Sequence, residues 1–125
     1  MKTYLCEIMD KVTKPWGYYI DFVREENKAL KELGVNPGSR LSLQSHQLRE
    51  EYWTCMEGEG IATLGDSTVT LSPGTRVYVP RRVVHRISNT GKGLLRIAEL
   101  QLGICDENDI RRYEDDFGRV AAKTA

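Results

Sequence analysis

The sequence predicts an all-β domain built as a sandwich or a barrel. Turn signals recur every several residues between about Gly17 and Gln101, for example Asn36-Pro37-Gly38 and Ser72-Pro73-Gly74. The segments between these turns are short and rich in β-branched or aromatic residues, which favour strands. Many short strands at this spacing are typical of sandwiches and barrels.

Six segments are predicted to be strands. Their ranges are 40–46, 51–56, 61–64, 68–71, 75–79 and 94–100. Gly65-Asp66 has the length and composition of a two-residue hairpin turn between the third and fourth of them, because a residue without a Cβ accepts positive φ.

Two further segments have features of helices. Residues 28–33, Lys-Ala-Leu-Lys-Glu-Leu, favour a helix on propensity alone. Residues 106–113 are predicted to form a capped helical turn, because acidic residues and an asparagine stand at its start. The residues after Arg119 are expected to fray.

Length and composition predict one domain with a single core. The chain has 125 residues, of which 40% are hydrophobic and 29% charged. We expect one domain over residues 1–125 with its core at about 11–120, because no linker or repeat divides the chain. No apolar run approaches the roughly 18 to 20 residues of a membrane span, and no secretory signal is found at the start. A cytoplasmic location without a membrane partner is therefore expected.

Charge and cysteine content argue against certain partners and certain kinds of site. Eighteen basic residues balance eighteen acidic ones, so the broad positive field that nucleic-acid binding requires is missing. The cysteines are Cys6, Cys55 and Cys105, an odd number without a CxxC pair. We expect reduced, structural cysteines rather than a disulfide framework or a thiolate zinc site.

Four polar residues form a candidate metal site. Gln44 and His46 project on the same face of a predicted strand, roughly 7 Å apart along the chain. Glu51 opens the next strand, and His85, the only other histidine, follows Pro80. Amide oxygen, carboxylate and two imidazoles suit a borderline divalent ion such as zinc, manganese, iron or nickel. Each residue taken singly has an ordinary structural role as its alternative.

The spacing of these residues resembles the two cupin motifs. The first motif is matched by Gly38, Gln44, His46, Glu51 and Gly58, with glutamine in place of its first histidine. The second is matched by Gly74, Pro80, His85 and Asn89, with Arg82 where the motif has glycine. The resemblance implies a cupin double-stranded β-helix, a jelly-roll barrel with short terminal extensions. It also implies a strand, not a helix, at 28–33.

Further segments resemble the C-terminal cupin domain of type II phosphomannose isomerases. They are Lys14-Pro15-Trp16-Gly17, residues 41–44 before His46, Arg49 with Glu51-Tyr52-Trp53, and residues 109–119. The likeness covers about residues 11–120. This domain is often fused behind a GDP-mannose pyrophosphorylase, whose nucleotidyltransferase half has no room in these 125 residues, so guanylyl transfer is not expected of them.

The resemblance implies an aldose–ketose isomerase that interconverts mannose 6-phosphate and fructose 6-phosphate. One divalent metal ion, with zinc the first choice and manganese, iron, cobalt or nickel the alternatives, would be held by Gln44, His46, Glu51 and His85. The ion would stabilise the negative charge that develops when a proton next to a carbonyl is removed. A separate group must carry that proton. The sequence leaves it open among Lys14, Glu50 and Tyr52.

Arginines are expected to bind the phosphate of the sugar, because their planar fork matches phosphate oxygens. The resemblance carries this role to Arg49, Arg112 and Arg119, and Arg82 beside His85 is a further candidate. Arg49 and Arg112, together with Lys14 and Tyr52, make up the predicted catalytic set. For Arg119 a solvated surface charge is an equal alternative, and Lys-Pro-Trp-Gly has a packing role as its alternative.

Departures from the family pattern keep two other functions open. Tyr52 stands where relatives have a histidine, and a phenol is a poor proton relay near neutral pH. A non-catalytic metal- and sugar-binding cupin is therefore the alternative. An iron-dependent oxygenase is a third hypothesis, because the fold does not fix the reaction. We expect a sugar phosphate as the partner and a homodimer as the assembly.

Overall fold

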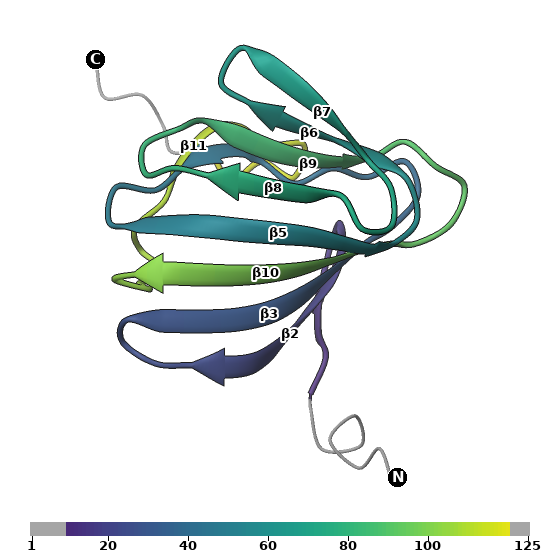
Figure 1. Cartoon of the computed structure of the whole chain (residues 1–125). Helices are drawn as coiled ribbons and strands as arrows, with labels where there is room; N and C mark the ends of the chain where they lie inside the picture. Colours follow the sequence, from purple (N-terminus) through teal and green to yellow (C-terminus); the bar gives the residue numbers. More distant parts are fainter. Residues whose placement is uncertain (1–9, 121–125) are drawn as a thin grey trace, which may run out of the picture.

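The computed structural model describes residues 10–120, which form eleven strands and no helix. The strands make two antiparallel sheets that face each other (Figure 1). The predicted all-β secondary structure is thereby confirmed. No part of residues 10–120 provides a helix able to cross a membrane.

The larger sheet has six strands and the smaller has five. The larger one has the order β1 (Val12–Lys14), β2 (Gly17–Arg24), β3 (Lys28–Val35), β10 (Leu95–Gly103), β5 (Arg49–Glu57) and β8 (Arg76–Val79). The smaller one has the order β11 (Arg111–Glu114), β4 (Leu43–Ser45), β9 (His85–Asn89), β6 (Gly60–Leu64) and β7 (Ser67–Leu71). Neighbours distant in sequence, such as β3 and β10, thus lie side by side (Figure 1).

The six predicted strands overlap β4 to β8 and β10, and the hairpin turn predicted between two of them is confirmed. Gly65-Asp66 joins β6 to β7 as a two-residue turn, with Gly65 at φ 55°. The segment 40–46 is strand only at Leu43–Ser45, and Arg40 adds an isolated bridge to Ser88. The predicted strands do not include β1, β2, β9 and β11.

The helix-like segment 28–33 is part of strand β3. It pairs with β2 on one side and with β10 on the other. Ala29 and Leu33 are buried in the interior, and Leu30 lies on the outer face. Pairing on both edges and burial of one face outweigh the small helix preference of these residues. The strand expected from the resemblance is confirmed.

The helical turn predicted at 106–113 is wrong. Only a tight turn forms, in which the Asp106 side chain accepts a hydrogen bond from the Asn108 backbone N–H at 2.9 Å and the Asp106 carbonyl accepts one from the Asp109 N–H at 3.0 Å. The chain then extends as β11 and pairs with β4. The capping residues therefore stabilise a turn, and the open edge of β4 makes the next segment a strand rather than a helix.

The interior between the sheets has an apolar end and a polar end. On β10 the inward residues run from Leu95 and Ile97 to Glu99 and Gln101, all buried. The neighbouring strands have the same order, because Ile97 pairs with Cys55 while Gln101 pairs with Glu51. The apolar end holds most of a core cluster made of Trp16, Leu33, Val35, Trp53, Cys55, Ala62, Leu71, Val77, Val79, Ile87, Leu95 and Ile97. The polar end is where a site can form.

Replacing Gly17 by alanine is expected to destabilise the fold by at least about 2 kcal/mol. Gly17 has φ 150°, which side chains rarely adopt, and a Cβ there would overlap the carbonyl oxygen of Gly34 on β3. Gly93→Ala is the matched control, because nothing lies within 4 Å of its added Cβ, and it should change the free energy of unfolding by less than about 0.5 kcal/mol. Urea unfolding measures both; equal stability of the two variants would contradict the prediction.

Candidate metal centre

Three buried side chains converge at the polar end of the barrel. His46 follows β4, Glu51 lies on β5 and His85 begins β9. One potential ligand atom from each lies within 4.8 Å of the others. The His46 Nε2 atom is 3.3 Å from Glu51 Oε2, and the His85 Nε2 atom is 3.7 Å from Glu51 Oε1. Residues separated by up to 39 positions in the sequence therefore meet at one point.

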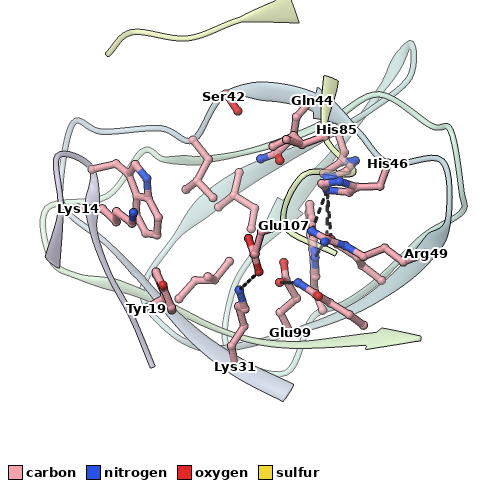
Figure 2. A pocket seen from close by; sticks show the side chains of 18 of the residues that line it. Lys14, Tyr19, Lys31, Ser42, Gln44, His46, Arg49, His85, Glu99 and Glu107 are labelled. Carbon is pink, nitrogen blue, oxygen red and sulfur yellow. Dashed lines mark hydrogen bonds and ion pairs between the residues drawn. The ribbon is translucent and has the colours of Figure 1, made fainter. Parts of the chain in front are cut away.

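Strand register explains why they meet. The inward face of β5 carries Glu51 and Trp53, and the indole N–H of Trp53 donates to Glu51 Oε1 at 3.1 Å. Gln44 on β4 pairs directly with His85 on β9. Gln44 lines the same cavity as the three others and lies beside His85 in Figure 2. All four residues predicted as metal ligands are thus gathered around one cavity.

Both histidines are oriented by backbone carbonyls. The Nδ1 atom of His46 is 2.7 Å from the Asp109 carbonyl oxygen, and the Nδ1 atom of His85 is 2.9 Å from that of Val83. Because a carbonyl only accepts, each Nδ1 carries the proton and each Nε2 presents its lone pair to the cluster. Burial, with help from the Arg49 charge, lowers the pKa of His46 to about 4, and burial also lowers the pKa of His85. Neutral imidazoles are the form that binds metals.

This donor set fits a divalent cation of the zinc type. Two imidazole nitrogens, one carboxylate and an amide oxygen provide four mixed donors, as such ions prefer. The buried thiols of Cys55 and Cys105 lie elsewhere and donate to backbone carbonyls, while Cys6 is outside the described residues.

Arg49 contacts the same cluster. Its Nε donates to Glu51 Oε2 at 3.0 Å, and its Nη2 donates to His46 Nε2 at 3.1 Å. The side chain is buried. The resemblance assigns Arg49 to the phosphate; in the structure its guanidinium lies against the candidate metal-ligand atoms and lines the cavity.

The cluster opens into a cavity of about 390 Å³. Its far wall carries Lys31, whose Nζ lies 3.9 Å from Asp21 Oδ1 and 3.7 Å from Glu107 Oε1. The same Nζ lies 4.7 Å from the centre of the Tyr19 ring. Figure 2 shows this charged wall across the cavity from the histidines. The cavity lining therefore combines charges of both signs with apolar side chains such as Leu33 and Ile87.

Two arginines of the C-terminal segment also line the cavity. Arg112 makes no side-chain hydrogen bond to any of the residues that the structure describes, although its Nε atom is buried. Burial, and then the charge of Arg119, lower its pKa. Arg119 is held by Asp115 through contacts of 2.7 and 3.1 Å. Arg112 thus has donors available for an anion, whereas Arg119 already has a partner.

A comparison with known families identifies the chain. The sequence model of the family described as "Mannose-6-phosphate isomerase C-terminal" matches residues 3–115 of the chain. The chain belongs to this family. The resemblance to type II phosphomannose isomerases is confirmed.

Relatives and solved structures agree with this assignment. The chain is 40% identical over 112 residues to the alginate biosynthesis protein AlgA of Pseudomonas aeruginosa, covering 89% of this chain and 23% of AlgA. It is 39% identical over 111 residues to the xanthan biosynthesis protein XanB of Xanthomonas campestris, covering 88% of this chain and 24% of XanB. The chain therefore spans about a quarter of the length of these relatives.

Similar structures support the cupin fold alone. The capsular polysaccharide assembling protein CapF of Staphylococcus aureus has a TM-score of 0.73 at 17% identity, over 85% of this chain and 34% of CapF. A cupin-2 domain protein of Rhodospirillum rubrum has a TM-score of 0.68 at 16% identity, over 81% of this chain and 78% of that one.

Two predicted site residues lie away from the cavity of this cupin domain. Tyr52 is 40% exposed on the outer face of the larger sheet, with its ring 5.0 Å from that of Tyr78. It neighbours Glu51, and successive residues of a strand point to opposite faces. Glu50 is outward too and accepts a hydrogen bond from Tyr78 at 2.8 Å. Arg82 lies in an exposed turn outside the cavity lining, at φ 69°. The catalytic role predicted for Tyr52 and the substrate contact predicted for Arg82 are corrected accordingly.

The predicted residue Lys14 does line the cavity, and the polar lining residues outside the predicted set include Asp21, Lys31, Glu99 and Gln101. The sequence holds a signal for the last three. Each lies on the same face of its strand as core residues do, so it points inward although its type is polar. A charged residue in the inward phase of a strand is uncommon in a core and indicates a site.

Without metal, the protein is expected to lose stability as the pH falls from about 6.5 to about 5. Because the pKa of His46 and of His85 is lower in the folded protein, the unfolded chain binds more of their protons in this window, which favours unfolding as pH falls. Burial, then the Glu51 charge, raises the pKa of Glu99 to about 7, so its proton has the opposite effect. Two groups against one leave a net loss of stability towards low pH, of at most about 1.4 kcal/mol per pH unit. Urea unfolding at each pH measures it, and a flat profile would contradict it.

Proposed function

We propose that this domain is a metal-dependent aldose–ketose isomerase that interconverts mannose 6-phosphate and fructose 6-phosphate, or a closely similar sugar phosphate. The observation that carries the proposal is one cavity that combines the buried His46, Glu51 and His85 cluster with the unpaired guanidinium of Arg112. Membership of the family agrees with it. Relatives such as the mannose-1-phosphate guanylyltransferase of Sinorhizobium fredii, at 34% identity, are also named for mannose phosphates.

Unpaired polar atoms in the cavity support a sugar phosphate as the ligand. Among the described residues, the buried side-chain atoms without a hydrogen-bond partner include the acceptors Asp21 Oδ1 and Gln101 Oε1 and the donor Arg112 Nε. All three residues line the cavity. Buried polar atoms are rarely left unpaired without a reason. A ligand with hydroxyl groups and an anionic group provides the donors and the acceptor that these atoms lack.

In this proposal each side chain has a separate task. Gln44, His46, Glu51 and His85 would hold one divalent ion. When bound, the ion would supply a Lewis acid that stabilises negative charge on the C1 and C2 oxygens of the sugar. Arg112 would bind the phosphate through charge-assisted hydrogen bonds. Ligation by His46 Nε2 would leave the Nη2 of Arg49 without its acceptor, so a substrate oxygen is the natural replacement.

The position of Tyr52 removes the reason for the alternative of a cupin that only binds metal and sugar. That alternative depended on Tyr52 in place of a histidine beside the metal. Tyr52 lies on the outer face of the barrel, where a histidine would be equally far from the cavity. We therefore keep the isomerase as the proposed function.

The test is turnover by metal-loaded protein. The protein is stripped with a chelator, reloaded with zinc, manganese, iron, cobalt or nickel, and incubated with fructose 6-phosphate while mannose 6-phosphate is followed. We expect turnover with at least one metal and none in the stripped sample. No turnover with any metal, in samples shown to hold one ion per chain, would overturn the isomerase.

A further inference from the structure

Glu99 is a buried carboxyl group that neither the metal cluster nor the core requires. It is 6% exposed, lies at the middle of β10 and lines the cavity (Figure 2). No cation lies within 4 Å of its carboxylate among the residues that the structure describes, since the ion pairs of the nearby Lys31 are made with Asp21 and Glu107. A carboxyl group buried without an ion pair is costly for folding, which indicates a function.

The strand register places Glu99 next to the reaction centre. On β10, Gln101 pairs with Glu51 of β5, and Glu99 pairs with Trp53, the next inward residue of β5. Two residues along a strand span ~7 Å. The reacting carbons must lie beside the cluster of Glu51, His46 and His85, because the negative charge of the reaction develops on their oxygens. Glu99 is thus the closest inward carboxyl group along β10 to that position.

The hydrogen bonds of Glu99 leave one oxygen available. Its Oε2 accepts a hydrogen bond from Gln101 Nε2 at 2.7 Å, and its Oε1 makes none among the described residues. Gln101 is 1% exposed, so it holds the carboxyl group in a fixed orientation. Charges that face Glu99 come from Glu51 on β5, Lys31 on β3 and Arg49 on β5. Burial raises the pKa of Glu99 to about 7, so both protonation states are accessible near neutral pH.

Lys31 is the rival for proton transfer, and its contacts argue against it. Its ammonium lies near two carboxylates, those of Asp21 and Glu107, and over the Tyr19 ring. The carboxylates and the ring hold the Lys31 Nζ atom at the far wall of the cavity, across from the histidines (Figure 2). Lys31 is better suited to binding an oxygen of the ligand.

We propose that Glu99 is the catalytic residue that carries the proton between C2 and C1 of the sugar phosphate, and that Gln101 positions it. In the direction from aldose to ketose, the Glu99 carboxylate takes the proton from C2. The electron pair of that C–H bond forms the C1=C2 double bond, and the π electrons of the C1 carbonyl move to O1. The protonated Glu99 then returns the proton to C1, while the O2 hydroxyl loses its proton to O1 and becomes the ketose carbonyl. No oxidant or further reactant is needed.

This inference rests on the proposed isomerase, and its test separates the two. Wild-type protein loaded with its active metal is incubated with fructose 6-phosphate in D₂O, and both mannose 6-phosphate and deuterium at the carbons next to the carbonyl are measured. Deuterium exchange without isomerisation overturns the isomerase, and the Glu99 variants are then compared by exchange. If neither reaction occurs with any metal, both proposals are overturned.

The decisive comparison is Glu99→Gln with Glu50→Gln as the matched control. Glu50 lies on the outer face of β5, away from the cavity. We expect Glu99→Gln to lower isomerisation and exchange by at least ~100-fold, while Glu50→Gln stays at the wild-type rate. Metal content and affinity for glucitol 6-phosphate, which has no carbonyl and cannot react, should change less than about threefold, as expected of a catalytic rather than a structural group. A rate within tenfold of wild type, or loss of glucitol 6-phosphate binding together with the rate, overturns the proposal.

Glu99→Asp keeps the test valid if Glu99→Gln does not fold. It retains a carboxyl group but withdraws it by one methylene. We expect at least a tenfold loss of rate with unchanged affinity for glucitol 6-phosphate, and a wild-type rate would again overturn the role of Glu99.

Discussion

Replacing Glu51 by glutamine is expected to lower the affinity of the protein for zinc by at least about 100-fold and to abolish isomerisation. Changes to groups that merely orient a metal ligand cost roughly 10- to 100-fold in affinity, and Glu51 would itself be the anionic ligand between His46 and His85. A neutral amide removes the negative charge that attracts the ion. It also leaves the buried guanidinium of Arg49 without its carboxylate partner.

Glu50→Gln is the matched control for this change. The two glutamates are neighbours on β5 but point to opposite faces, so the same substitution is made in the same strand inside and outside the cavity. Zinc affinity of each purified variant is measured by competition with a chelator of known affinity. Equal affinities of the two variants would show that Glu51 does not bind the metal.

Replacing Arg112 by methionine is expected to weaken fructose 6-phosphate binding by about 10- to 100-fold. Charge-assisted hydrogen bonds are worth about 1.5 to 3 kcal/mol, and about 1.4 kcal/mol corresponds to a factor of ten in affinity. Because the Arg112 side chain makes no hydrogen bond within the described part of the chain, the loss should fall on ligand binding. Methionine keeps much of the side-chain volume, so stability should change little.

Arg111→Met controls for the loss of a positive charge on β11. Arg111 is exposed on the opposite face and lies over the Tyr113 ring at 5.0 Å. Calorimetric titration of both variants with fructose 6-phosphate gives the comparison. If Arg111→Met weakens binding as much as Arg112→Met, the phosphate is attracted by overall charge and not by Arg112.

Motif spacing in the sequence predicts which side chains gather at the candidate metal centre. The intervals between Gln44, His46 and Glu51 keep all three on inward positions around one strand connection, and His85, which follows Pro80 in the second motif, begins β9. A period of two residues then fixes which face each occupies. The same period shows why Tyr52 was misplaced: it adjoins Glu51 and must point outward.

The polar wall could not be predicted from the motifs. Glu99 and Lys31 stand opposite each other only because β10 pairs with β3 in a particular register, across more than sixty residues of sequence. Register between distant strands depends on the packing of the whole barrel. Local propensity failed for the related reason that β3 is paired on both edges, which turned a helix-like segment into a strand.

X-ray absorption at the zinc edge of the zinc-loaded protein tests most directly whether His46, Glu51 and His85, which are distant in the sequence, bind one ion. We expect nearest neighbours of nitrogen and oxygen alone, at about 2.0 to 2.2 Å, with more distant scattering from two imidazoles. Sulfur at about 2.3 Å, or scattering from fewer than two imidazoles, would contradict a centre built from His46, Glu51 and His85.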